Sequence, residues 1–144
     1  MDTLIKKLTL PIFMLGLIML IIRGDFLSRS PLVIAGQLAG FILIICSRVA
    51  FGKQQFNFTA EPGDGPLAQR GPYRILRHPI YAGALLIIWS SILGHWSIFN
   101  VAIGVIVLLF VLLRISAEER LLRKQYLDYA DYALRTKRIL PFIY

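Results

Sequence analysis

Four runs of apolar residues limit what this chain can fold into. They extend over Leu8 to Ile22, Leu32 to Phe51, Ile80 to Leu93 and Ile98 to Leu113. A helix that crosses a bilayer needs about 20 consecutive apolar residues; the second run has this length, and the first approaches it if it begins near Leu4. With 57% hydrophobic residues, the chain is also too apolar for an ordinary soluble protein. The sequence therefore predicts an all-α integral membrane protein with about four transmembrane helices.

The spacing of these runs predicts how the chain is organised. Its 144 residues suit a single domain. A short polar turn, Arg23 to Pro31, separates the first two runs, so we expect residues 1–51 to form an N-terminal helical hairpin. Only Gly94 to Ser97 lie between the last two runs. This predicts a second antiparallel pair, within a functional core that covers residues 52–144.

The second run carries small residues at helical spacing and also the single cysteine. Ala35, Gly36, Ala39 and Gly40 recur on one part of this run, and small residues let membrane helices approach closely. We therefore expect this helix to pack tightly on a neighbour. Cys46 can form no disulfide within the chain, and its apolar surroundings predict a small buried side chain.

The distribution of positive charge predicts how the helices are oriented. Counting Arg48 with the loop that it borders, all Lys and Arg residues except Arg23 and Arg29 lie near the N-terminus, between the second and third runs, or after the fourth. Cytoplasmic segments of membrane proteins are rich in these residues, so we expect both termini on the cytoplasmic side of a cytoplasmic (inner) membrane. The net charge of +8 does not predict nucleic-acid binding here, because the cations do not form one polar face.

Beyond the fourth run the sequence keeps a helical pattern but becomes charged. Leu121, Leu122 and Tyr126 keep helical spacing among the charges of the stretch from Arg114 to Tyr126. This pattern predicts a cytoplasmic amphipathic helix that is followed by a C-terminal tail.

A polar and aromatic segment, Gly71 to Gly83, runs straight into the third apolar run. Proline has the backbone φ suited to the first position of a helix, so His78-Pro79 predicts a turn that opens the third helix. Free N–H groups at such an end favour an anionic or hydrogen-bonding ligand, and Gly83 would let that ligand or another helix come close. The two arginines of the segment could instead be a simple membrane anchor, but an anchor leaves the histidine, the tyrosines and the glycine unexplained.

The antiparallel arrangement of the last two helices brings this segment near Glu118 and Glu119. The start of the third helix and the end of the fourth are neighbours in such a pair, so the sequence predicts a composite cytoplasmic site. Its candidate members are the loop backbone around Gly65 to Ala68 and the side chains of Tyr73, His78, Tyr81, Arg114, Glu118 and Glu119. In the alternative, the two glutamates pair only with cations on the same solvated helix, Arg120, Arg123 or Lys124.

The residue types in this group favour some kinds of chemistry over others. No serine nucleophile stands in a recognisable pattern with them, and no two histidines lie one helical turn apart with a carboxylate, as a metal site would need. Hydrolase and metalloenzyme functions are therefore disfavoured, and we expect no metal. The group is suited to hold a polar or cationic cofactor against an apolar substrate, with Glu118 offsetting a positive charge.

Three motifs of the chain occur together in one known superfamily. They are Gly71-Pro72-Tyr73, then Arg77-His78-Pro79-Ile80-Tyr81-Ala82-Gly83, and Glu118-Glu119 after the helical pair. This combination resembles the isoprenylcysteine carboxyl methyltransferase and phospholipid methyltransferase superfamily of integral-membrane enzymes that depend on S-adenosylmethionine. The resemblance covers roughly Gly65 to Tyr144, including closing residues Tyr129, Tyr132, Arg138 and Pro141. The chain departs from the family after Tyr126, where Leu127 stands in place of the usual glycine.

The resemblance implies a cofactor, its binding residues and a reaction. S-adenosylmethionine would be held by Pro66, Leu67, Ala68, Tyr73, His78, Pro79, Ile80, Tyr81 and Glu118. In the carboxyl methyltransferases an arginine one turn before the matching glutamate engages the substrate, and Arg114 has that position here. The implied function is methyl transfer to a lipid-like acceptor in the membrane. We favour a carboxylate, which is ionised at neutral pH and needs no general base; the alternatives are a phospholipid amine methyltransferase, a sterol-reductase-like role and a non-catalytic membrane scaffold.

Overall fold

The computed structural model describes residues 2–51, 67 and 69–140, and this part of the chain is helical. It contains five α-helices and one short 3-10 helix: α1 (Asp2–Ile22), α2 (Pro31–Phe51), η1 (Gly71–Arg74), α3 (Pro79–Gly94), α4 (Ile98–Gln125) and α5 (Tyr129–Arg135). The four long helices contain the four apolar runs of the sequence. The predicted all-α class is therefore confirmed.

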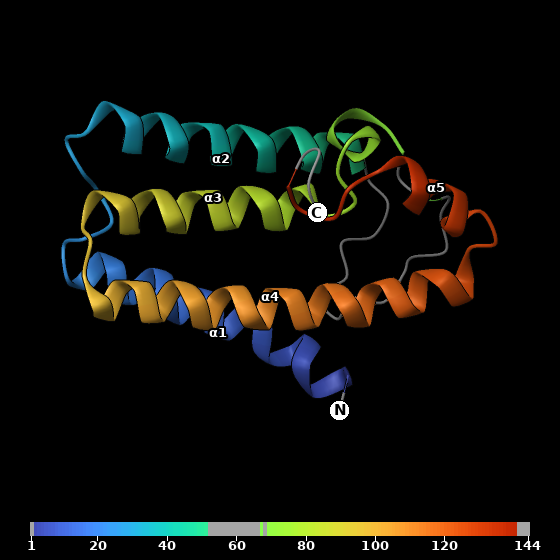
Figure 1. Ribbon diagram of the computed structural model, residues 1–144, viewed down its shortest axis with the longest axis horizontal. Coiled ribbons are helices and arrows are strands. Elements are labelled where there is room, and N and C mark those ends of the chain that lie inside the picture. The colour runs from blue at the N-terminus through green and yellow to red at the C-terminus, as the bar shows by residue number, and fades with distance from the viewer. Residues whose placement is uncertain (1, 52–66, 68, 141–144) are drawn as a thin grey trace.

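The long helices pack in an order that differs from their order in the sequence. Figure 1 shows α2, α3 and α4 running along the long axis of the molecule, with α1 beside α4 and α5 at one end. The closest pairs are α2 with α3 and α1 with α4, whereas α3 and α4 make fewer contacts. Within the described ranges, α1 and α2 hardly touch. The predicted N-terminal hairpin is therefore not a packed pair, since each of its helices packs on a helix from the second half of the chain.

Two glycines allow α2 and α3 to approach until their backbones touch. A Cβ atom added at Gly40 would lie 2.6 Å from the carbonyl oxygen of Gly83, and one added at Gly83 would lie 2.7 Å from that of Gly40. No larger residue fits these positions without moving a backbone. The tight packing predicted for α2 is confirmed, and its partner is α3. The space beside Gly83 is thus filled by a helix and not by a ligand.

Local signals determine where α3 and α4 begin. Pro79 lies in the first turn of α3, directly after His78, as its fixed φ predicts. Ser97 caps α4, because its side chain accepts a hydrogen bond from the Asn100 N–H at 3.1 Å. From there α4 continues without a break through the charged stretch to Gln125, in agreement with the helical pattern of the sequence. The short helix α5 follows where only a tail was expected.

The outer faces of the long helices are apolar, which supports membrane association. By length and composition, α2 and α4 are each able to cross a bilayer, while the apolar stretches Lys7–Ile22 and Pro79–Gly94 are shorter. Leu32 is 85% exposed and Ile98 is 91% exposed, in a pattern that lipid, and not water, would solvate favourably. Cys46 is exposed on α2, so its predicted burial is wrong. An apolar side chain on a lipid-facing surface needs no cover from the protein.

Hydrogen bonds join the two inter-helix turns at the end of the bundle opposite α5 (Figure 1). Asn100 Nδ2 donates to Asp25 Oδ2 at 3.0 Å and to the His95 carbonyl at 2.8 Å. The hydrogen bond from Asn100 lowers the pKa of Asp25, and Arg23, at 2.9 Å, acts in the same direction. His95 thus belongs to a structural turn far from His78.

Candidate active site

His78 lies between two glutamates at the start of α3. Its Nδ1 is 3.6 Å from Glu118 Oε2, and its Nε2 is 3.6 Å from Glu119 Oε1. The imidazole also stacks beside the ring of Tyr81, with ring centres 5.8 Å apart and planes inclined by 24°. The predicted meeting of the α3 turn and the glutamate pair of α4 is therefore confirmed.

Glu118 holds two polar side chains on one of its oxygens. The Tyr81 hydroxyl donates to Oε1 at 2.5 Å, and Arg114 Nε donates to the same oxygen at 2.9 Å. Arg114 lies one helical turn before Glu118, and its guanidinium carbon is 5.8 Å from the centre of the Tyr81 ring. The second oxygen, Oε2, faces His78 beyond hydrogen-bond distance. Within the described part of the chain, hydrogen bonds therefore hold one oxygen of Glu118 and leave the other without a donor.

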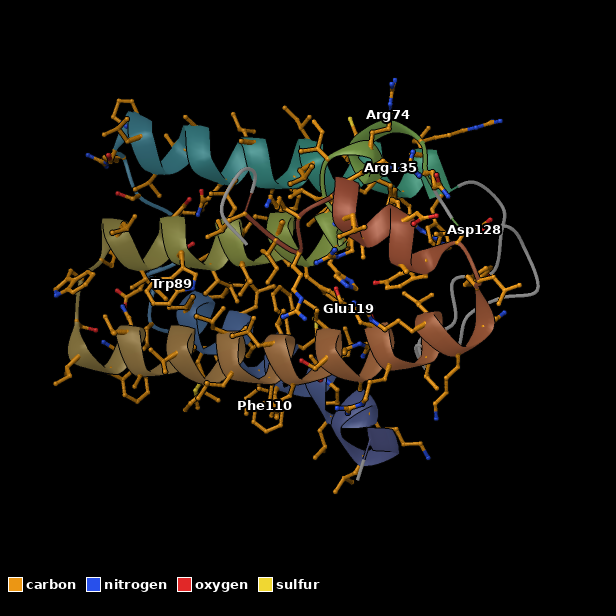
Figure 2. All side chains as sticks on the ribbon, turned by 45° about the vertical axis from the view of Figure 1, so that its right-hand side comes forward. Arg74, Trp89, Phe110, Glu119, Asp128 and Arg135 are labelled. Carbon is orange, nitrogen blue, oxygen red and sulfur yellow. The ribbon has the colours of Figure 1, made fainter. Side chains whose placement is uncertain are left out.

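Glu119 is the centre of a buried ion cluster. Arg77 Nε lies 2.9 Å from Oε1, in an orientation that makes the contact an ion pair and not a hydrogen bond. Arg138 Nε donates to Oε2 at 3.2 Å, and Arg138 Nη2 lies 3.1 Å from the same oxygen. Figure 2 shows Glu119 turned toward the interior, whereas Asp128 and Arg135 lie on the outer side of the C-terminal part. The alternative in which this glutamate pairs only with cations of a solvated helix is therefore wrong.

The two adjacent glutamates thus differ in what they can still bind. The side chain of Glu119 is 5% exposed, and its oxygens face Arg77, Arg138 and His78. The side chain of Glu118 is 15% exposed, and its Oε2 accepts no hydrogen bond from the residues that the structure describes. Glu118 thus keeps an acceptor oxygen that a hydrogen-bond donor or a positive charge could meet, whereas the oxygens of Glu119 already face two arginines and His78.

Residues 129–139, called the C-terminal segment below, attach to the turn before α3 through main-chain hydrogen bonds. The Arg77 N–H donates to the Lys137 carbonyl at 2.7 Å, and the His78 N–H donates to the Arg138 carbonyl at 3.0 Å. In the other direction, the Lys137 N–H donates to the Ile75 carbonyl at 2.9 Å. The backbone of His78 is therefore held from the C-terminal side as well as by α3.

Tyr73 is placed by packing on α2 and by a hydrogen bond from α5. Its ring lies 5.7 Å from that of Phe51, and its carbonyl accepts a hydrogen bond from the Tyr132 hydroxyl at 2.8 Å. Burial raises the pKa of Tyr132 to about 12, so this hydroxyl remains a donor at neutral pH. Gly71, with φ +56°, lets the chain turn sharply into η1 just before Tyr73.

The structure places the other predicted site residues in part. Pro79 is buried and Ile80 is half-buried in the first turn of α3, and Leu67 is half-buried. Pro66 and Ala68 lie outside the described residues. The predicted residues that make direct contact with one another are His78, Tyr81, Arg114 and Glu118.

Sequence reasoning missed the contacts that join the C-terminal segment to this site. Arg77 Nη1 donates to the carbonyls of Ala133 at 2.6 Å and Thr136 at 3.2 Å, and Ile139 packs into the hydrophobic core. These partners are 56 and 59 residues from Arg77 in the chain, so no local pattern reveals them. Only the resemblance of Tyr132 and Arg138 to a family's closing segment pointed to this region.

Comparisons with known proteins agree on one kind of relative. Residues 32–128 match the family model described as phospholipid methyltransferase. The chain is 32% identical over 123 residues to Protein-S-isoprenylcysteine O-methyltransferase A of Arabidopsis thaliana, in an alignment that covers 81% of this chain and 54% of that protein. The chain thus spans about half the length of this curated relative. No solved structure matches the chain.

Proposed function

Because the chain belongs to the superfamily of isoprenylcysteine carboxyl methyltransferases and phospholipid methyltransferases, we propose that it transfers a methyl group from S-adenosylmethionine to a lipid-like acceptor. The single observation that carries the proposal is the contact group of His78, Tyr81, Arg114 and Glu118. It joins two of the three motifs on which the resemblance depends, and it lies where apolar helices meet a charged end of the molecule.

The residues of this group suit S-adenosylmethionine, which carries an activated methyl group on a positively charged sulfur. The side chain of Glu118 is 15% exposed, and its Oε2 lies 3.6 Å from His78 Nδ1, so we assign this oxygen to hydrogen bonds from a ribose or an ammonium group. The stacked rings of His78 and Tyr81 offer an aromatic surface at the same place. We assign Pro66, Leu67, Ala68, Tyr73, Pro79 and Ile80 to the remainder of the cofactor site.

Arg114 is the residue that we assign to the acceptor. It is 7% exposed, and its Nε is fixed by Glu118, so its guanidinium is already oriented before a substrate arrives. A planar guanidinium suits a carboxylate because it can form two parallel hydrogen bonds with it. The chain then has to align the acceptor oxygen with the methyl group and exclude water. We therefore favour a carboxylate as the methyl acceptor.

We further propose that all four long helices span the membrane, with the contact group on the cytoplasmic side and both termini there. The distribution of Lys and Arg supports this orientation. An apolar acceptor would reach the site from the bilayer, and the polar cofactor from the cytoplasm. We therefore assign the protein to a cytoplasmic membrane, with membrane lipids as its surroundings.

Two measurements on purified protein in lipid nanodiscs test the proposal. Calorimetry should detect binding of S-adenosylmethionine, and a methyl-labelled cofactor incubated with a membrane-lipid extract should give a labelled lipid-soluble product. Binding of a nicotinamide cofactor in place of S-adenosylmethionine would support a reductase. Absence of binding to either cofactor would support a non-catalytic scaffold, and both results would refute the proposed function.

A phospholipid amine is the second candidate acceptor, and the match to the phospholipid methyltransferase model favours it. The labelled product distinguishes the two. A methyl ester is cleaved by mild base and releases volatile label, whereas an N-methyl group stays on the lipid. We expect base-labile label, and base-stable label would show that the acceptor is an amine.

An Arg114→Lys variant is expected to bind S-adenosylmethionine within about threefold of the wild type while its turnover falls about 100-fold, as loss of a bidentate contact to the acceptor would cause. Lysine is chosen because alanine would also remove the hydrogen bond to Glu118 and so disturb the proposed cofactor site. The measurement is calorimetry together with initial rates at saturating cofactor. An equal loss of affinity and turnover would contradict the role assigned to Arg114.

A further inference from the structure

Glu119 connects three parts of the chain that are distant in sequence. It belongs to α4, contacts Arg77 and His78 at the turn before α3, and contacts Arg138 in the C-terminal segment. Two arginines share this single carboxylate, and its side chain is 5% exposed. Breaking such a buried group leaves uncompensated charges, so its members strongly prefer to stay together.

Arg77 extends the cluster to the end of α5. While its Nε faces Glu119, its Nη1 donates to the carbonyls of Ala133 and Thr136. The last carbonyls of a helix have no partner within the helix, and a cation near them is favourable. Arg77 therefore acts as a cap for α5. The planar guanidinium of arginine can contact Glu119 and the α5 carbonyls at the same time, whereas the single ammonium group of a lysine is not spread over both sites.

The C-terminal segment held in this way is itself attached to the proposed cofactor site. The Tyr132 hydroxyl bonds the Tyr73 carbonyl, and the Arg138 carbonyl accepts from the His78 N–H. Tyr73 and His78 are thus positioned from outside by residues that follow them by more than 50 positions. If the segment moved away, both residues would lose these contacts.

We propose that Glu119 is a positioning residue, which through Arg77 and Arg138 holds the C-terminal segment against the turn from Tyr73 to His78. It contacts no cofactor. Its role is to keep His78 at a fixed distance from Glu118, so that the site is formed before a ligand binds. This inference rests on the proposed function for its effect on cofactor affinity, but the attachment of the segment is independent of that function.

The test combines hydrogen exchange with cofactor binding in nanodiscs. In a Glu119→Gln variant, amides of residues 129–139 should exchange about tenfold faster or more, because the segment opens more often. The affinity for S-adenosylmethionine should fall about tenfold, while turnover at saturating cofactor stays within about threefold, since bound ligand restores the arrangement. An Arg77→Lys variant should show the same pattern, because it keeps the charge but loses the fork.

Two controls separate positioning from other roles. Glu118→Gln should weaken cofactor binding without faster exchange in residues 129–139, and Arg135→Gln, at an exposed arginine on the outer side of α5, should change neither. If Glu119→Gln weakens binding while exchange in the segment stays at the wild-type rate, Glu119 is a direct ligand and the proposal is overturned. Unchanged exchange and unchanged affinity would overturn it as well.

A milder variant keeps the test decisive if Glu119→Gln does not fold. Arg138 has a side chain that is 31% exposed, so Arg138→Gln should fold and still show faster exchange in residues 136–139. Exchange at the wild-type rate in this variant would overturn the proposal. If the wild type binds no S-adenosylmethionine, the proposed function fails, and the exchange data alone then decide whether Glu119 holds the segment.

Discussion

A Gly83→Leu variant is expected to be less stable than the wild type by about 3 kcal/mol, the upper end of what overpacking in a protein interior usually costs. The reason is that the α2 backbone, at the carbonyl oxygen of Gly40, and the side chain of Ile44 together occupy the space into which the new side chain would grow. The two helices would have to separate along their contact. Denaturation of the purified protein in mixed detergent micelles, followed by circular dichroism, measures the change.

A matched control comes from α2, the other helix of this pair, at a position outside the contact. Ala39 precedes Gly40 on α2 but is exposed, so Ala39→Leu should change the free energy of unfolding by no more than about 0.5 kcal/mol. Gly40→Leu should behave like Gly83→Leu. Equal stabilities for Gly83→Leu and Ala39→Leu would show that α2 and α3 do not touch through their backbones.

A Glu118→Gln variant is expected to bind S-adenosylmethionine about 100-fold more weakly, because hydrogen bonds to a charged group contribute about 1.5–3 kcal/mol each and every 1.4 kcal/mol is tenfold in affinity. The neutral amide also loosens Arg114 and Tyr81, which both donate to Oε1 in the wild type. Calorimetry or equilibrium dialysis with labelled cofactor measures the affinity.

The control for Glu118→Gln removes a carboxylate from the same end of the molecule. Asp128 is exposed beside α5 (Figure 2), so Asp128→Asn should leave the affinity within about twofold, as surface substitutions usually do. If Glu118→Gln bound the cofactor as tightly as Asp128→Asn does, Glu118 would have no place in the cofactor site.

Much of the fold is predictable from local features of the sequence. The four apolar runs, Pro79 after His78 and the helical spacing beyond Leu113 predicted the four long helices, because each of these features acts within a few residues. Which helices pack against each other was harder to predict from the sequence. Whether α2 packs on α1 or on α3 depends on how Gly40 meets Gly83. A row of small residues on α2 predicts close packing but does not indicate which helix packs there.

In the site as well, contacts set by local sequence features could be predicted, and contacts between residues distant in the chain could not. His78 and Glu118 could be brought together from the sequence because the ends of adjacent antiparallel helices must meet. Glu119 could be included in the site, but its partners Arg77 and Arg138 could not be predicted, because they face it only once the C-terminal segment has folded back. The carbonyl partners of Arg77 at the end of α5 could not be predicted either, because nothing near Arg77 in the chain indicates where residues 133–136 will lie.

The continuity of α4 has a consequence for the choice of acceptor under the proposed function. At 1.5 Å per residue, the stretch from Ile98 to Glu118 rises by about 30 Å, which is close to the thickness of the hydrocarbon layer. If α4 spans the membrane as proposed, a continuous helix of this length holds Glu118 at the interface between the hydrocarbon layer and water, whatever lipid lies beside it. Acceptors should then be sorted by the depth of their reactive group, and lipids that differ only in tail length should react equally well.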